Sequence, residues 1–172
     1  MTDWNIRLAR PEDAEHMPAI EAAAGELFKT VPELASLDIY DDGWEPDELR
    51  QLIARGHCLV AEEGSKRIGF LASQPFGREL HIWELDVVPA HQGKGIGAAL
   101  LRGAMIDAGN AGFAALTLTT FREIPWNAPF YAKLGFEEVT ALDAHPRLAG
   151  ELAVEADSGL PPSMRCAMIK FL

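Results

Sequence analysis

The sequence predicts an α/β domain in which helices flank a mixed, mostly antiparallel central sheet. Short segments of alternating polarity are interspersed with longer amphipathic segments. Three strand-like segments follow one another between residues 58 and 88, and a glycine-rich turn joins the last of them to a helix. At 172 residues the chain is long enough to bury a core, and no repeat or linker divides it. We therefore expect residues 1–172 to form a single domain.

The first third of the chain predicts one strand and two helices. Trp4, Ile6 and Leu8 alternate with polar or small residues, which is typical of a half-buried strand. Pro11, followed by two acids, begins a helix that continues to about residue 29. Residues 33–48 predict an acidic loop or the beginning of a second helix, which runs from Pro46 to about residue 55.

The rest of the chain predicts a hairpin followed by alternating strands and helices. Strands at residues 58–62 and 67–73 flank a turn, and a third strand covers residues 80–88. A helix begins near Gly95, a buried strand covers residues 114–120, and Asn127 caps a short helix that Gly135 ends. Strands near residues 136–140 and 164–171 follow, with a long loop expected over residues 142–162.

Charge and composition exclude several classes of protein. The formal net charge is −11, so the chain lacks the basic face that nucleic-acid binding requires. No apolar run exceeds four residues, and the N-terminus has no export signal, so we expect a cytoplasmic protein without a membrane span. Cys58 and Cys166 show no metal-ligand spacing, and neither do the five histidines; we expect no metal site and two buried thiols.

The strongest local motif is the strand-to-helix turn within residues 87–101. It contains three alternate glycines, Gly93, Gly95 and Gly97, which let the backbone approach a ligand closely. The free N–H groups at the beginning of the following helix favour an anion. A P-loop is excluded because Lys94 is followed by Gly95 rather than by Ser or Thr, and the dinucleotide-binding spacing is absent. A tight connection within a sheet is the alternative interpretation.

Two motifs together resemble the GCN5-related N-acetyltransferase (GNAT) family. Gln92, Gly95 and Gly97 match the family's Q/R-x-x-G-x-G/A motif for acyl-CoA. Downstream, residues 127–136 are similar to the family's segment of an Asn, an aromatic pair and Leu-Gly-Phe. The resemblance covers residues 4–140 and, more loosely, the last strand.

The resemblance implies a fold in which two neighbouring strands splay apart and hold acetyl-CoA, the cosubstrate, between them. The pyrophosphate would lie against the backbone amides of the turn, and the strand edge at Leu85 and Val87 would pair with the pantetheine arm. Asn127 would cap its helix and also touch the cofactor. The implied residues of the turn are Gln92, Gly93, Lys94, Gly95, Ile96 and Gly97.

The implied reaction is direct acetyl transfer to a primary amine. Tyr131 occupies the family's position for the general acid, and a phenol is suited to protonating a departing thiolate; packing in the core is the alternative. For the base, strand alternation places Ile82, Glu84 and Asp86 on one face. Glu84 is the first candidate and Asp86 the second, because desolvation raises a carboxyl pKa toward a useful value.

The acceptor is predicted to be a cation, such as a polyamine, another small amine or a basic peptide. Residues 1–63 hold 15 acids and 5 bases. Tyr40, Asp41, Asp42 and Trp44 lie in a connection that, by resemblance, forms a wall of the acceptor site. The acids within residues 33–48 are equally compatible with a solvated loop and a helix N-terminus. A non-catalytic acyl-CoA-binding sensor or scaffold of the same fold is the alternative function, and a homodimer remains open.

Overall fold

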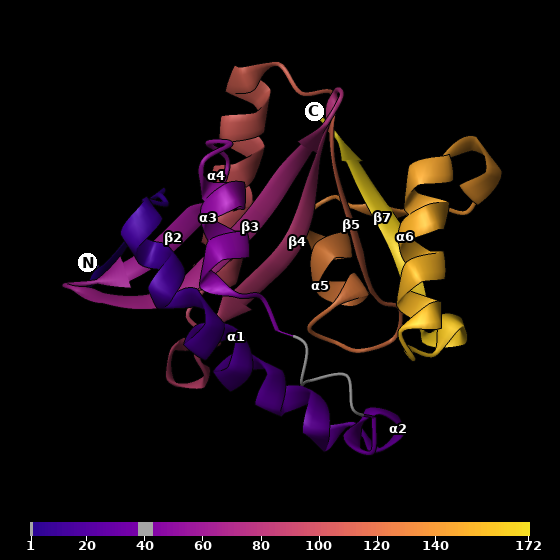
Figure 1. The fold of residues 1–172 in the computed structure, drawn as a ribbon, viewed down its shortest axis with the longest axis horizontal. Coiled ribbons are helices and arrows are strands. Elements are labelled where there is room, and N and C mark those ends of the chain that lie inside the picture. Colours follow the sequence, from indigo (N-terminus) through magenta and orange to yellow (C-terminus); the bar gives the residue numbers. More distant parts are fainter. Residues whose placement is uncertain (1, 38–42) are drawn as a thin grey trace.

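The computed structural model describes residues 2–37 and 43–172 as one open sheet with helices on both faces (Figure 1). The strands are β1 (Trp4–Leu8), β2 (Leu59–Glu63), β3 (Lys66–Phe76), β4 (Glu79–Val87), β5 (Ala115–Phe121), β6 (Glu137–Glu138) and β7 (Arg165–Phe171). The helices are α1 (Met17–Gly25), α2 (Pro32–Ala35), α3 (Pro46–Ile53), α4 (Ile96–Ala111), α5 (Ala128–Lys133) and α6 (Pro146–Asp157). Short 3-10 turns include η1 (Pro11–Glu15), η2 (Glu26–Thr30) and η3 (Pro89–His91).

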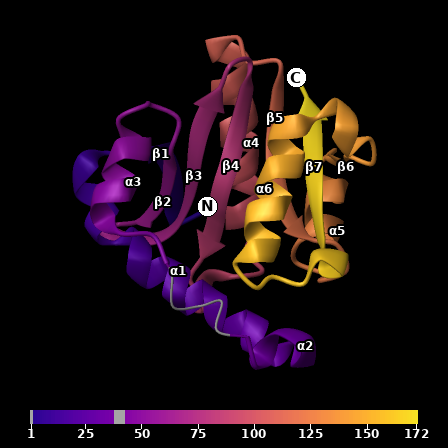
Figure 2. The same ribbon diagram turned by 45° about the vertical axis from the view of Figure 1, so that its right-hand side comes forward.

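The sheet has the order β1-β2-β3-β4-β5-β7-β6, and β4–β5 is its one parallel pair among the described residues. α4 covers one face, while α1, α3 and α6 cover the other (Figure 2). Apolar residues alternate between these layers: Leu59 and Leu71 pack toward α4, whereas Val60 and Phe70 pack toward α1 and α3. The predicted mixed, mostly antiparallel sheet is confirmed.

β4 and β5 pair over only part of their length and then separate. They pair only from Glu79–Ala115 to His81–Thr117, although β4 continues to Val87 and β5 to Phe121. Figure 1 shows the two strands diverging, with α5 beside the gap. The parted stretch of β4 therefore has unpaired main-chain groups on the side that faces β5.

A β-bulge changes which side chains of β4 share a face. Ala72 pairs with Glu84 but Ser73 pairs with Ile82, so Trp83 is an extra residue in β4. Ile82 packs in the core beneath α4, whereas Glu84 lies near α1 on the opposite face. The predicted common face for Ile82, Glu84 and Asp86 is thus wrong, because the inserted residue reverses the alternation between Ile82 and Glu84.

The segment expected as a long loop over residues 142–162 contains α6. Pro146 occupies its first turn, and Leu148 is buried in a small core with Ala115, Ala167 and Ile169. α6 therefore owes its stability to packing on β5 and β7, since its sequence carries only a narrow apolar stripe.

Both cysteines are free and buried, as expected. Burial raises the pKa of the Cys58 thiol to about 11, and burial also raises the pKa of Cys166. None of the helices built from the described residues is long and apolar enough to cross a membrane.

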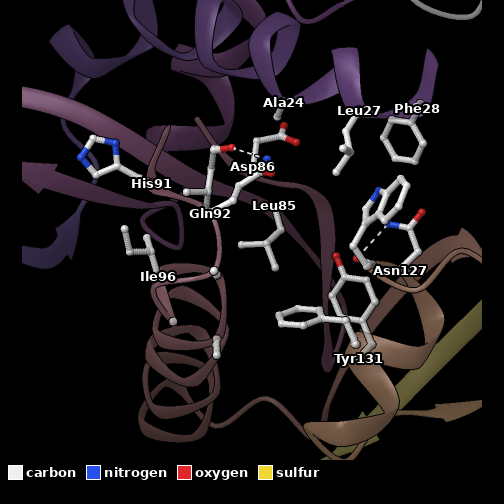
Figure 3. Close-up of a pocket in the computed structure, with 17 residues that line it drawn as sticks. Ala24, Leu27, Phe28, Leu85, Asp86, His91, Gln92, Ile96, Asn127 and Tyr131 are labelled. Atoms are coloured by element: carbon white, nitrogen blue, oxygen red, sulfur yellow. Dashed lines mark hydrogen bonds between the residues drawn. The ribbon is translucent and has the colours of Figure 1, made fainter. Parts of the chain in front are cut away.

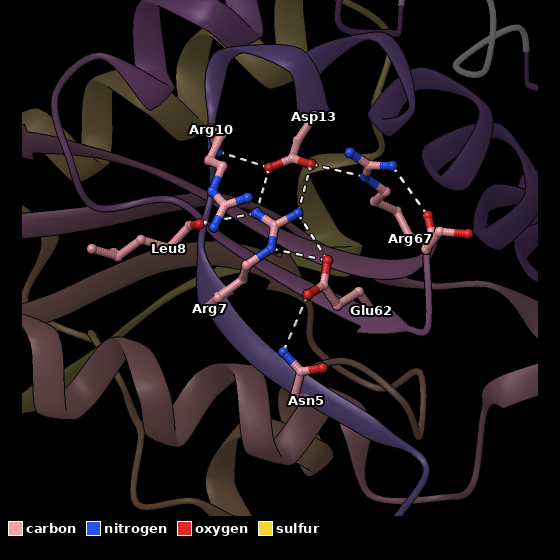
Figure 4. A network of polar contacts seen from close by, with 8 residues as sticks. Asn5, Arg7, Leu8, Arg10, Asp13, Glu62 and Arg67 are labelled. Atoms are coloured by element: carbon pink, nitrogen blue, oxygen red, sulfur yellow. Dashed lines mark hydrogen bonds and ion pairs between the residues drawn. The ribbon is translucent and has the colours of Figure 1, made fainter.

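A buried carboxylate joins the N-terminal strand to the rest of the sheet (Figure 4). Asp13 of η1 is fully buried and accepts hydrogen bonds from Arg7 Nη1 at 2.7 Å, Arg7 Nη2 at 3.0 Å and Arg67 Nε at 2.9 Å. The Arg10 backbone N–H donates to it at 2.7 Å. Burial alone would raise the pKa of Asp13, but these donors outweigh it and hold the pKa well below its usual range.

We predict that Asp13→Ala lowers the free energy of unfolding by about 3–5 kcal/mol at pH 7, because it leaves two arginines without their buried partner. Urea denaturation measures the loss. Asp47→Ala is the matched control: Asp47 pairs with Arg50 but is 90% exposed, and such pairs contribute less than about 1 kcal/mol.

The same contribution should depend on pH. Since the folded pKa of Asp13 is depressed, its stabilisation is present above the unfolded pKa of about 3.9 and fades as the pH falls below that value. The gap in stability between parent and Asp13→Ala should therefore narrow below about pH 4. An equal loss for Asp47→Ala, or a gap that stays constant down to pH 2, would contradict this assignment.

Candidate active site

The glycine-rich turn forms an anion cradle at the N-terminus of α4. Gly93 and Gly95 have φ of +76° and +82°, a region that favours glycine, and Gly95 is the N-cap of α4. A Cβ at either position would meet nothing within 4 Å, so the turn faces open space. The first N–H groups of this 16-residue helix have no partner within the helix and point toward that space.

A cavity of about 390 Å³ begins at this cradle and extends to α5 and α1 (Figure 3). Leu85, Asp86 and Val87 form one wall, in the stretch of β4 that no longer pairs with β5. The remaining lining residues are Ala24, Leu27, Phe28, His91, Gln92, Gly93, Gly95, Ile96, Gly97, Ala98, Trp126, Asn127, Phe130 and Tyr131. The cavity thus joins a polar cradle to an apolar end.

Most of the residues predicted to bind the cofactor line this cavity. They are Leu85, Val87, Gln92, Gly93, Gly95, Ile96, Gly97 and Asn127. Lys94 does not line it and is exposed. The Gln92 side chain donates from Nε2 to the Val87 carbonyl at 3.0 Å, which ties the turn to the end of β4.

Asn127 is the N-cap of α5 by position, but its side chain makes no capping hydrogen bond. Its Nδ2 donates to the Trp126 carbonyl at 3.1 Å, and its buried Oδ1 has no hydrogen-bond partner among the described residues. The expected capping role thus rests on the backbone alone, since the Asn127 carbonyl accepts from the Tyr131 N–H at 3.1 Å. The free Oδ1 is available as an acceptor for a ligand.

Tyr131 lies where α5 meets the cavity and is 9% exposed. Its ring packs edge-on against Phe130 and Phe136, with centroids 5.3 and 5.7 Å away. Burial, together with the charges of Asp86 and Glu84, raises the pKa of Tyr131 above its usual value. The phenol is therefore protonated at neutral pH and can donate a proton.

Three carboxylates meet where the parted stretch of β4 faces α1. Glu84 and Asp86 of β4 and Glu21 of α1 place oxygen atoms within 4.8 Å of one another. Burial and the charges of Asp86 and Glu21 raise the pKa of Glu84 well above its usual value. Burial and the charge of Glu21 raise the pKa of Asp86 to about 7. The carboxylate cluster can thus hold a proton at a pH at which an exposed carboxyl is ionised.

The predicted acceptor wall is only partly described. Trp44 contacts the carboxylate cluster, because its indole Nε1 donates to Glu84 Oε1 at 3.3 Å. Its ring lies 6.0 Å from that of Trp83. Tyr40, Asp41 and Asp42 lie outside the described residues. Of the predicted acceptor residues, Trp44 is thus placed beside the candidate base Glu84.

Sequence reasoning missed Glu21 and the apolar end of the cavity. Leu27 and Phe28 of η2 lie opposite Tyr131 in Figure 3, and Trp126 packs on Phe28 with ring centroids 5.8 Å apart. An acid in an amphipathic helix is typical of a solvated face, so Glu21 carried no signal of its own. For Trp126, the only sign in the sequence of a place at the site was its position immediately before the motif at residues 127–136.

Comparisons with known proteins agree with this geometry. A profile described as an acetyltransferase (GNAT) domain matches residues 54–138. The N-alpha-acetyltransferase RimI of Mycobacterium tuberculosis is 30% identical over 135 residues, covering 74% of this chain and 84% of that protein.

Two solved structures share the fold at low identity. The PaiA N-acetyltransferase of Thermoplasma acidophilum, in complex with coenzyme A, has a TM-score of 0.71 at 19% identity, with both chains fully covered. Arabidopsis thaliana Naa50, in complex with the bisubstrate analogue CoA-Ac-MVNAL, has a TM-score of 0.67 at 15% identity, covering 99% of this chain and 100% of that one. On the profile match and the RimI relative, the chain belongs to the GNAT family of acetyltransferases.

Proposed function

We propose that this acetyltransferase transfers the acetyl group of acetyl-CoA to a primary amine that reaches β4 as a cation, and that the amine is a peptide N-terminus. One observation carries the proposal: the cavity and the carboxylate cluster meet on consecutive residues of β4. Glu84 belongs to the cluster, Leu85 lines the cavity, and Asp86 does both. A bound thioester and an approaching amine would therefore meet at this stretch of strand.

The residues present fit acetyl-CoA. The open cradle at Gly93 and Gly95 suits a pyrophosphate, because N–H groups and the positive end of the α4 dipole face it. The unpaired edge of β4 at Leu85 and Val87 suits the amide groups of a pantetheine arm. Acetyl-CoA supplies the thioester carbonyl that the amine attacks.

Glu84 and Tyr131 have complementary proton roles in this proposal. Because an ammonium has no lone pair, the amine first gives one proton to Glu84 and then attacks. As the C–N bond forms and the C–S bond breaks, the nitrogen releases its second proton to solvent. The Tyr131 phenol protonates the leaving thiolate and afterwards regains its proton from solvent. The raised pKa of Glu84 makes it a stronger base than an exposed carboxylate. The raised pKa of Tyr131 keeps its proton in place until the thiolate develops.

The acceptor class is inferred from charge and from the relatives. A cluster of three carboxylates attracts an ammonium group, and the nearby indoles of Trp44 and Trp83 offer π-faces to a cation. The 30% identical relative is an N-alpha-acetyltransferase, and the analogue bound to Naa50 carries a peptide. The acidity of the cluster also favours a polyamine, which is the second candidate. Tyr40, Asp41 and Asp42 remain predicted acceptor residues.

An acceptor panel tests the function. We expect release of free CoA thiol from acetyl-CoA with a short lysine-free peptide that has a free α-amine, and none with the same peptide carrying an acetylated N-terminus. Faster turnover of spermidine than of any peptide would transfer the assignment to a polyamine. If CoA binds in calorimetry but no amine releases thiol, the chain is a non-catalytic acyl-CoA-binding module.

Tyr131→Phe should lower kcat by about 10²–10⁴-fold, since it removes the proton donor and keeps the ring in place. Affinity for CoA, measured by calorimetry, should change little. If chemistry limits kcat in the parent, an unchanged kcat would show that Tyr131 has only a packing role. A pre-steady-state burst in the parent would show instead that product release is slower than chemistry.

Glu84→Gln should lower kcat/KM by about 10²–10⁴-fold at pH 8 and remove the acidic limb of its pH profile. In the parent, kcat/KM should rise with pH as the carboxylate cluster loses its proton, since the pKa of Glu84 is raised well above its usual value and that of Asp86 to about 7. Steady-state assays over a range of pH measure both effects. Glu137→Gln, on the exposed end strand β6, is the control and should keep the parent profile.

The thermal stability of Glu84→Gln should rise although its activity falls. A carboxyl whose pKa is raised by folding destabilises the folded state as the pH rises past its unfolded pKa of about 4.3. Glu84→Gln should therefore raise Tm at pH 8 and have little effect at pH 4. A variant that is inactive because it is misfolded would show a lower Tm instead.

A further inference from the structure

Glu21 connects the acceptor side of the active site to the candidate base. It lies on α1 between the buried residues Ile20 and Ala24. Its Oε1 accepts a hydrogen bond from the Trp44 backbone N–H at 2.9 Å. A Cβ at Gly43 would lie 2.5 Å from the same oxygen, so the carboxylate packs closely against the backbone at Gly43. Glu21 thus fixes the backbone of residues 43–44 against α1.

Trp44 links Glu21 to Glu84 through two hydrogen bonds. The backbone N–H of Trp44 donates to Glu21, and its indole Nε1 donates to Glu84 Oε1 at 3.3 Å. Glu21 is therefore linked to the candidate base in two ways: through Trp44, and directly across a gap of less than 4.8 Å between carboxylate oxygens. Figure 3 shows Asp86, the third member, pointing toward α1 near Ala24.

Among the described residues, the charged groups that act on Glu21 at close range are carboxylates. Glu84 and Asp86 face it from β4, and Glu48 acts on it from α3. Within residues 2–37 and 43–172, no lysine or arginine forms an ion pair with Glu21, Glu84 or Asp86. Three close carboxylates without a cation cannot all be ionised cheaply, so a proton shared among them is the stable arrangement.

We propose that Glu21 is a positioning residue for the transfer reaction: its carboxylate orients Glu84 through Trp44, and its negative charge strengthens Glu84 as a base. This inference rests on the proposed function of Glu84. It assigns two separable effects to one side chain, an anchor for Trp44 and a charge next to the base.

Glu21→Gln separates the two effects, because the amide oxygen can still accept from the Trp44 N–H while the charge is lost. We expect the acidic limb of kcat/KM to move to lower pH by about one unit. The plateau should fall a few-fold, since a weaker base transfers a proton less readily. Glu21→Asp, which keeps the charge, should return the midpoint toward that of the parent.

Glu26→Gln is the matched control. It removes the same charge five residues along the chain, from a side chain that is 63% exposed and paired with Lys29. We expect the parent midpoint in this variant. An unchanged midpoint in Glu21→Gln, or an equal shift in Glu26→Gln, would overturn the inference, because a merely structural Glu21 would lower kcat without moving the profile.

The test also separates this inference from the proposed function. If Glu84→Gln keeps the acidic limb, Glu84 is not the base and the proposed function fails. If Glu84→Gln removes the limb but Glu21→Gln leaves it in place, only the role of Glu21 fails. Activity that is lost on chelation and restored by a divalent cation would also overturn the inference, since the carboxylate cluster would then hold a metal rather than a proton.

A second measurement covers a variant that does not fold. Carboxyl ¹³C NMR of the parent should show Glu21, Glu84 and Asp86 titrating together in shared steps, above the ordinary range of a carboxyl pKa. Independent titration of Glu21 at the ordinary carboxyl pKa of about 4.3 would overturn the proposal without any substitution.

Discussion

The site depends on the loss of pairing between two neighbouring strands. Parallel strands normally remain hydrogen-bonded along their common length, but β4 and β5 separate after His81 and Thr117. This leaves main-chain groups of β4 free and makes room for the cavity beside Leu85 and Val87. The bulge at Trp83, just past the last pair, turns Glu84 toward α1. A fully paired sheet would provide neither feature.

Local motifs could be predicted from the sequence because they depend on residues that are close together along the chain. The spacing of Gly93 and Gly95 predicted a turn that approaches a ligand, and the resemblance to the GNAT family pointed to Tyr131; the structure places all three on one cavity. The face of Glu84 was not readable in the same way. One inserted residue reverses strand alternation, and nothing in the composition of residues 79–87 marks the bulge.

Elements that depend on tertiary contacts were also beyond the sequence. α6 carries one buried side chain, Leu148, and an internal Gly150, so its helical pattern is weak until β5 and β7 supply a surface. Glu21 is similar: its importance arises from Trp44 and Glu84, which are 23 and 63 positions away along the chain. Periodicity cannot reveal a partner at that distance.

Two groups of buried acids show how the same residue type serves opposite purposes. Asp13 is surrounded by arginine donors and stabilises the fold as an anion. Glu84 has carboxylate neighbours, so its ionisation opposes folding and favours proton uptake.

The burial of Cys58 and Cys166 has a practical consequence, because thiol–disulfide exchange requires an accessible thiolate. Neither side chain should react quickly with a disulfide reagent, and the native enzyme should leave a colorimetric assay of liberated coenzyme A free of background.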